Sequence, residues 1–450
     1  MVRGERLVRT MERHIGLEQE LFLVDEEGVL SSRADEFLER CWKMAESEGS
    51  SPESFAEECA KNIIEINTPP TRTLSELAEA YLSGLDLALR AGRKLGLRLY
   101  PLATYPLPAK PALRADKRYK LQALTVGWQR FLHAARCAGV HLHLELSRGT
   151  VDPDRVVAHD APPAAREELL NLYNLGTALD PALIALTRAS PFYEGQAPGV
   201  AVRTAFYRGN ALFGWEGLYK NLPEVGALRP YVKSVEELVE LQLTGYREWL
   251  RAMDRAGVAR RLFFEAEGNA LKASWNPVRT NRHGTVELRG IDGNYPKVVL
   301  MTATLIHGAA NRIRREKLAV VPDERSHLFR VEGDRLFVPG FRYLSKDLFY
   351  AATTSGIGSA EVRTYVDSIV EFAKPERLGT EHPAGLEFHG DSYKTVEVEI
   401  LERFPQTSLS ADEGLRLVRE SCDELEEQVS SLRRKCWSKP EPEDSEIGTQ

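Results

Sequence analysis

The chain has few of the features that mark secreted or membrane proteins. Its 450 residues include only five cysteines, with no C-x-x-C spacing. This disfavours zinc and redox sites as well as a disulfide framework, and predicts reduced thiols. No run approaches the ~20 apolar residues of a membrane span, and residues 1–13 carry charges in place of a signal peptide's apolar core. We therefore expect a cytoplasmic protein with no membrane partner.

The chain also has no strong block of charge of one sign. It contains 59 Lys and Arg against 66 Asp and Glu, a net charge of -7. This balance argues against a nucleic-acid partner. The phosphate-binding sequence G-x-x-x-x-G-K-[ST] is absent too, so any phosphate site must depend on metal ions and arginines.

No boundary divides the chain sharply. Hydrophobic residues make up 43% of it, ample for a sizeable core. We expect a single domain over residues 1–437, with a helical C-terminal part from about residue 376. Residues 438–450 are rich in Pro and Glu, a composition that predicts a disordered tail.

Four stretches with alternating polar and apolar residues stand out, and residues 14–25 are the first. On a strand, Glu18 and Glu20 share one face and leucines occupy the other. Neighbouring carboxylates repel unless water covers the face or cations lie between them and a ligand. Such hard oxygen ligands suit Mg2+ or Mn2+. For this stretch alone, a solvated acidic strand is the simpler interpretation.

The other three stretches repeat the design. Residues 62–67 place Glu65 opposite two isoleucines, and residues 138–146 place His141, His143 and Glu145 opposite four apolar residues. Residues 283–292 place Glu287 and Arg289 on one face. Imidazoles are good ligands for divalent metals. The alternatives are a polar edge strand and a surface Arg-Glu ladder of little energetic consequence.

Two further segments carry weaker signals. The loop of residues 190–199 has the glycine, proline and aromatic content of a loop that lines a site, and it leads to Arg203 and Arg208. Either arginine could bind a carboxylate or phosphate through two N–H groups, although a surface arginine is more common. Residues 395–400 also alternate, in a charged context, and we read Glu397 and Glu399 as ordinary solvated acids.

Five segments together resemble a known family in order and spacing. They are Gly16-Leu17-Glu18-Gln19-Glu20, Glu65-Ile66-Asn67-Thr68-Pro69, His141-Leu142-His143, Ser190-Pro191-Phe192-Tyr193-Glu194-Gly195 and Gly284-Thr285-Val286-Glu287-Leu288-Arg289. The chain resembles the second family of glutamate–cysteine ligases, which includes bacterial carboxylate–amine ligases and belongs to the glutamine synthetase-like superfamily. The resemblance covers residues 14–375 and rests on the set, since each segment alone is loose.

The resemblance implies a fold and a set of site residues. The fold is of the α+β class, an antiparallel sheet curved into a funnel-shaped active site with helices packed outside. The implied metal ligands are Glu18, Glu20, Glu65, His141 or His143, and Glu287. The implied nucleotide-binding residues are Glu18, Glu20, Arg279 and Arg289. Arg203 and Arg289 fall on positions that meet substrate carboxylate or phosphate, and Trp275 and Arg279 on the segment leading into the last strand.

The implied activity is an ATP-dependent ligation that serves glutathione biosynthesis. Two or three Mg2+ ions, or Mn2+, would bridge the carboxylates and the phosphates of ATP. The γ-carboxylate of glutamate would attack the γ-phosphate, and the amine of cysteine would displace phosphate from the acyl phosphate. Departures from the family pattern at Gln19, Glu145, residues 203–207 and residues 292–295 leave the acid and the amine open. The alternatives are a ligase for other small molecules, a non-catalytic nucleotide or metal sensor, and a structural protein. The sequence does not indicate the oligomeric state.

Overall fold

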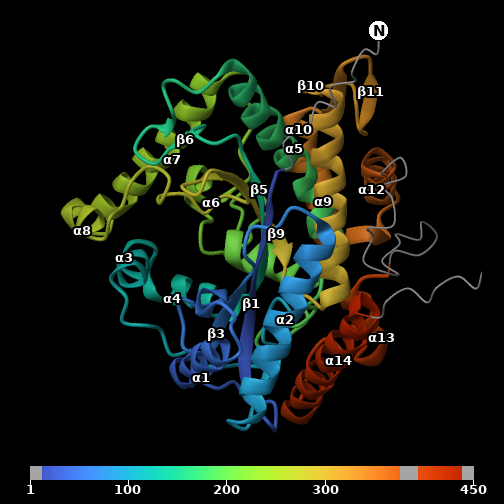
Figure 1. The fold of residues 1–450 in the computed structure, drawn as a ribbon. Coiled ribbons are helices and arrows are strands. Elements are labelled where there is room, and N and C mark those ends of the chain that lie inside the picture. The colour runs from blue at the N-terminus through green and yellow to red at the C-terminus, as the bar shows by residue number, and fades with distance from the viewer. Residues whose placement is uncertain (1–12, 375–393, 438–450) are drawn as a thin grey trace, which may run out of the picture.

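A computed structural model describes residues 13–374 and 394–437 (Figure 1). Its centre is a seven-stranded antiparallel sheet in the order β2-β3-β1-β5-β9-β8, with β4 also paired to β1. The strands are β1 (Ile15–Asp25), β2 (Phe55–Glu57), β3 (Ile63–Asn67), β4 (Leu97–Tyr100), β5 (Gly139–Glu145), β8 (Val278–Asn281) and β9 (Thr285–Asp292). The smaller sheets are formed by β6 (Val151–Asp152) with β7 (Val156–Val157), and by β10 (Ala319–Asp323), β12 (Arg335–Pro339) and β11 (Arg330–Glu332).

Helices flank the central sheet on two sides (Figure 1). On one side, α2 (Leu74–Arg93), α5 (Pro163–Thr187) and α9 (Pro296–Glu316) pack on its strands, and α14 (Ala411–Trp437) packs on α2 and β4. The other helices are α1 (Ala34–Ser47), α3 (Lys117–Val126), α4 (Trp128–Phe131), α6 (Pro223–Gly226), α7 (Val235–Arg255), α8 (Arg260–Glu265), α10 (Phe341–Tyr343), α11 (Phe349–Thr354), α12 (Ala360–Ala373) and α13 (Val396–Arg403). The expected antiparallel sheet with helices outside it is present.

The alternating pattern of β1 divides the sheet into an apolar face and a polar face. Leu17 and Leu21 are buried against the helices, whereas Glu18 and Glu20 point the other way and are only partly buried. Burying an aliphatic side chain of this size stabilises the fold by roughly 2 kcal/mol. This stabilisation fixes the register of β1 against its neighbours, since a slip of one residue would expose the leucines and bury the glutamates.

Gln19 breaks the alternation of polar and apolar residues without breaking the packing. It lies on the apolar face and is fully buried. Its Nε2 donates to the backbone oxygen of Asn294 at 2.8 Å, and its Oε1 accepts from the hydroxyl of Tyr81 on α2. Both polar ends are therefore satisfied, which removes most of the cost of burying an amide.

Residues 163–187 form the single helix α5, which has Pro181 inside it. One local expectation was wrong. Residues 395–400 contribute to helix α13, not to a solvated strand, and Glu397 is buried. Here contacts with the rest of the chain overrode a short alternating pattern.

Helix α5 also corrects the expectation that no segment approaches a membrane span. By length and composition it qualifies, with a mean hydropathy of 1.2 over its most apolar window, and 83% of that window is buried inside the protein. A helix whose apolar residues are already covered by its own fold is typical of a core helix. The predicted tail at residues 438–450 lies outside the described residues.

Candidate active site

Strand pairing brings the acids and histidines of four separate segments onto the polar face of the sheet. In the β1–β3 pair, Glu20 lies opposite Glu65, and in the β1–β5 pair Glu18 lies opposite His141. In the β5–β9 pair, His143 lies opposite Glu287. Because directly opposed residues have Cβ atoms about 5 Å apart, these side chains must meet.

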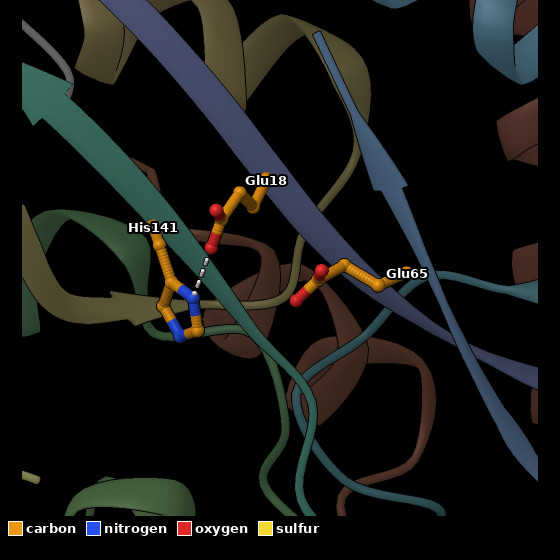
Figure 2. Close-up of side chains that lie close together, drawn as sticks. All are labelled: Glu18, Glu65 and His141. Carbon is orange, nitrogen blue, oxygen red and sulfur yellow. Dashed lines mark hydrogen bonds and ion pairs between the residues drawn. The ribbon is translucent and has the colours of Figure 1, made fainter. Parts of the chain in front are cut away.

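One group of possible metal ligands consists of Glu18, Glu65 and His141, whose ligand atoms lie within 4.8 Å of one another. Figure 2 shows the three side chains converging from β1, β3 and β5. His141 Nδ1 lies 3.0 Å from Glu18 Oε2, while His141 Nε2 is buried without a hydrogen-bond partner and lies 3.8 Å from Glu20 Oε1. Burial and the nearby Arg289 lower the pKa of His141, which favours the neutral imidazole that a metal requires.

A second group consists of Glu18, His143 and Glu287. His143 Nε2 lies 3.1 Å from Glu18 Oε1, and its Nδ1 lies 3.0 Å from the hydroxyl of Thr285. Burial alone would raise the pKa of Glu18, but hydrogen bonds with the two histidines outweigh it and lower that pKa. Each histidine thus belongs to a different group, and Glu18 belongs to both.

The third group, Glu20, Glu58 and Glu65, contains a residue that the sequence patterns missed. Glu58 follows directly after the short strand β2, which pairs with β3, so no alternation marks it. Burial and the neighbouring Glu20 raise the pKa of Glu58 to about 8, and burial and three acidic neighbours raise the pKa of Glu65 well above its usual range. None of the three carboxylates forms an ion pair with Lys or Arg in residues 13–374 and 394–437.

Glu287 has a different environment, because arginines surround it. It is fully buried and accepts from Arg279 Nε at 2.8 Å, from Asn281 Nδ2 at 2.6 Å and from Arg289 Nη1. Burial would raise its pKa, but the charges of the two arginines outweigh burial and lower it well below the usual range. Arg289 Nε is buried and has no partner. Both predicted arginines of this segment therefore reach the site.

Arg203 also lies beside these residues, whereas Arg208 and Glu145 do not. Arg203 is 5% exposed, its Nη1 donates to the backbone oxygen of Arg289 at 3.1 Å, and its Cζ lies 5.3 Å from the ring centre of Tyr207. Arg208 forms a buried ion pair with Asp180 of α5. Glu145 accepts from the backbone and the ring of His14, away from the other acids.

A cavity of about 850 Å³ opens from the polar face and includes Glu18 and Arg279 in its lining. Five Lys and Arg side chains line it, from α3, the segment after α8, β8 and the β8–β9 turn: Lys117, Arg118, Lys272, Arg279 and Arg282. The lining also contains Asp116, Glu265 and Glu267, of which Asp116 pairs with Arg118 and Glu267 with Lys272. Trp249, Trp275, Phe263 and Tyr119 supply aromatic surface. The aromatic side chains and the Lys and Arg side chains of this lining suit a ligand that has a flat apolar part and a negatively charged part.

Comparison with known proteins supplies a family and a fold. The model of the family described as glutamate–cysteine ligase family 2 matches residues 14–332. A glutamate–cysteine ligase of Halobacterium salinarum is 29% identical over 294 residues, covering 64% of this chain and 66% of that protein. A Rubrobacter xylanophilus protein, provisionally named as a glutamate–cysteine ligase, is 26% identical over 284 residues, covering 62% of this chain and 63% of its own length.

The chain therefore matches just under two thirds of the length of these relatives. Among solved structures, a bifunctional glutathione synthetase from Pasteurella multocida aligns with a TM-score of 0.50 and 16% identity. The alignment covers 93% of this chain and 52% of that one. At this identity the likeness concerns the fold alone.

Proposed function

The chain belongs to glutamate–cysteine ligase family 2, and on this premise we propose that it is an ATP-dependent carboxylate–amine ligase that releases ADP and phosphate. The proposed acid is glutamate, which reacts through its γ-carboxylate, and the proposed amine is cysteine or another small amine. The names of the relatives support this choice. The product would be an amide such as γ-glutamylcysteine.

One observation carries the proposal: three overlapping groups of possible metal-ligand side chains share one face of the sheet beside a cavity lined by five Lys and Arg side chains. Carboxylates held together in a partly buried place without a Lys or Arg partner are unfavourable unless cations join them. The donor set of carboxylates and imidazoles suits Mg2+ or Mn2+. Glu20, Glu58 and Glu65 would hold one ion, and Glu18 with His141 or His143 would hold others.

When bound, Mg2+ neutralises phosphate oxygens so that an anionic carboxylate can approach them. The residues of the chain supply the rest. Lys117, Arg118, Lys272 and Arg282 would attract the polyphosphate of ATP into the cavity, and the aromatic wall would cover its base. This arrangement needs no glycine-rich phosphate loop, in agreement with the sequence.

The arginines around Glu287 are suited to the transferring phosphoryl group. Arg289 keeps its Nε free of hydrogen bonds while Glu287 fixes its other end, so the guanidinium is oriented before the ligand arrives. Preorganised donors of this kind act on the charge that develops in the transition state. Arg203, one hydrogen bond away, would bind a carboxylate of the acid substrate.

The test is purified protein with Mg-ATP, glutamate and a panel of single amines, with products identified by mass spectrometry. We expect an amide of glutamate to accumulate together with ADP. Glu18→Gln should lower the rate about 1,000-fold, or about 4 kcal/mol, because Glu18 belongs to two metal groups. The matched control is Glu145→Gln, whose carboxylate pairs with His14 instead, and its rate should stay within about twofold.

Three other outcomes contradict parts of the proposal. An amide of a different acid would retain the ligase and exclude glutamate. Stoichiometric ATP binding without turnover of any amine would favour a sensor. Equal affinity of the wild type and Glu18→Gln for Mg-ATP would exclude the metal site itself.

A further inference from the structure

Strand β5 begins with Gly139, which lies on the polar face of the sheet, in alternation with His141 and His143. Its backbone N–H donates to Glu20 Oε2 at 2.6 Å. The guanidinium of Arg203 occupies the space next to the Cα atom of Gly139, where a side chain would begin. A Cβ built on Gly139 would approach Arg203 Nε to 2.8 Å and the outer atoms of the guanidinium more closely still. No real Cβ is found so close to other heavy atoms.

The position of Arg203 is fixed by its surroundings as well as by this contact. Arg203 is 5% exposed, and its guanidinium is hydrogen-bonded to the backbone of Arg289 and lies over the ring of Tyr207. If the guanidinium moved away from Gly139, it would lose both the hydrogen bond to the backbone of Arg289 and the contact with the ring of Tyr207. The side chain next to Gly139 is therefore not a flexible surface arginine that could move aside at little cost.

The guanidinium nevertheless has unused donors. Arg203 Nε is buried without a hydrogen-bond partner, and within the described parts of the chain no acidic side chain forms an ion pair with Arg203. An arginine has five N–H donors, and leaving them unpaired in a buried place is costly. An anionic ligand that binds beside Glu20 would satisfy them.

We propose that Gly139 is a positioning residue: the absence of a side chain lets Arg203 lie on β5 beside Glu20 and present its free N–H groups to the carboxylate of the acid substrate. The same residue holds Glu20 through its backbone N–H. One position thus sets the distance between a metal-binding carboxylate and a substrate-binding arginine. The substrate part of this inference rests on the proposed ligase function.

The two roles of Gly139 can be separated by experiment, since Gly139→Ala keeps the backbone N–H but adds the Cβ. We expect the affinity for Mn2+, measured by electron paramagnetic resonance, to stay within about twofold. The KM for the acid substrate should rise about tenfold or more. Gly16→Ala is the matched control, because Gly16 lies on the neighbouring strand and its Cβ would meet nothing closer than 3.7 Å. Equal KM values for Gly139→Ala and Gly16→Ala would overturn the proposal.

A double-mutant cycle tests whether Gly139 acts through Arg203. Lysine has no guanidinium to collide with a Cβ, so Arg203→Lys and the double variant Gly139→Ala/Arg203→Lys should have the same KM within about twofold. If instead the tenfold effect of Gly139→Ala persists on top of Arg203→Lys, the residue acts by another route and the inference is wrong.

The thermal midpoint provides a readout that does not depend on catalysis. Gly139→Ala should lower the midpoint while the protein still folds, and Gly139→Ala/Arg203→Ala should regain most of the loss because the collision is removed. A loss of the same size with Ala at position 203 would overturn the positioning role. A regained midpoint, together with a wild-type protein that shows no ligase activity, would support the positioning and reject the proposed function, so the two failures are distinguishable.

Discussion

Two sets of carboxylates in this protein, one buried and one partly buried, differ in their partners. On α5 and α13, Asp180 and Glu397 are each paired with an arginine, Arg208 and Arg188, and all four side chains are at most 8% exposed. On the polar face of the central sheet, Glu20, Glu58 and Glu65 gather without a Lys or Arg partner in the described residues.

This difference separates a structural use of acids from a functional one. A buried pair is self-sufficient, because each charge satisfies the other and the hydrogen bonds are complete. A cluster of unpaired carboxylates raises the free energy of the apo protein, and burial raises the pKa of Glu58 to about 8. The second arrangement makes physical sense when cations complete it.

Breaking a self-sufficient pair should have the largest effect on stability. Arg208→Met leaves Asp180 buried and unpaired, and we expect the free energy of unfolding to fall by about 3–5 kcal/mol. Urea unfolding followed by circular dichroism measures this. The double variant Arg208→Met/Asp180→Leu should recover most of the loss. A loss of under about 1 kcal/mol in the single variant would mean that the pair is not as isolated from water as its 1% and 6% exposures indicate.

The unpaired group should respond in the opposite direction. Burial and acidic neighbours raise the pKa of Glu65, so folding of the apo protein must either protonate this acid or bury its charge. Glu65→Gln removes that cost, so the apo protein should become more stable. Saturating Mg2+, at about 100 times its dissociation constant, should stabilise the wild type by about 2.7 kcal/mol. Most of that gain should be lost in Glu65→Gln. Thermal unfolding with and without Mg2+ measures both effects.

Glu145→Gln serves as the control for this second prediction. Glu145 lies on the same strand as the two histidines but pairs with His14. Its substitution should leave the response to Mg2+ unchanged. A full response to Mg2+ in Glu65→Gln would show that the ion binds elsewhere.

The sequence predicted the strands of the site because their apolar faces alternate over enough residues. The register of Glu18, Glu65, His141 and Glu287 follows from those faces, since a slip would expose leucines. Glu58 could not be found in this way. It follows a three-residue strand and reaches the site only because β2 pairs with β3.

The sequence could not predict the partners of Arg203 and Arg208, because these partners are set by the tertiary structure. Arg203 and Arg208 are five residues apart, and the sequence offers no reason to treat them differently. Arg203 nevertheless faces the site, whereas Arg208 pairs with Asp180. The short π-helical segment Thr204–Arg208 separates their directions. No spacing rule for regular helices or strands anticipates such a turn. Helix α5 continues through Pro181 because its surroundings bury it on all sides.

Asp292 shares features of both groups, and its substitution is the test that discriminates most sharply between them. It is 3% exposed and no ion pair involves it in the described residues, although Arg203 is close enough to act on it. Burial raises its pKa to about 6, and the charge of Arg203 only partly opposes this. Since the folded state holds the proton more tightly than the unfolded state, the stability from protonated Asp292 is present at low pH and is lost as the pH rises through about 6.

Asp292→Asn mimics the protonated acid at every pH. We therefore expect the variant to exceed the wild type in free energy of unfolding by about 3 kcal/mol at pH 8, and the difference to shrink as the pH falls from about 6 to about 4. Urea unfolding at a series of pH values measures the difference directly. If Asp292 instead behaved like Asp180, with the arginine dominating, the variant would be less stable than the wild type at pH 8. That reversal of sign would show that Asp292, like Asp180 and Glu397, is stabilised by an arginine. Glu20, Glu58 and Glu65 would then remain as the carboxylates that need a cation.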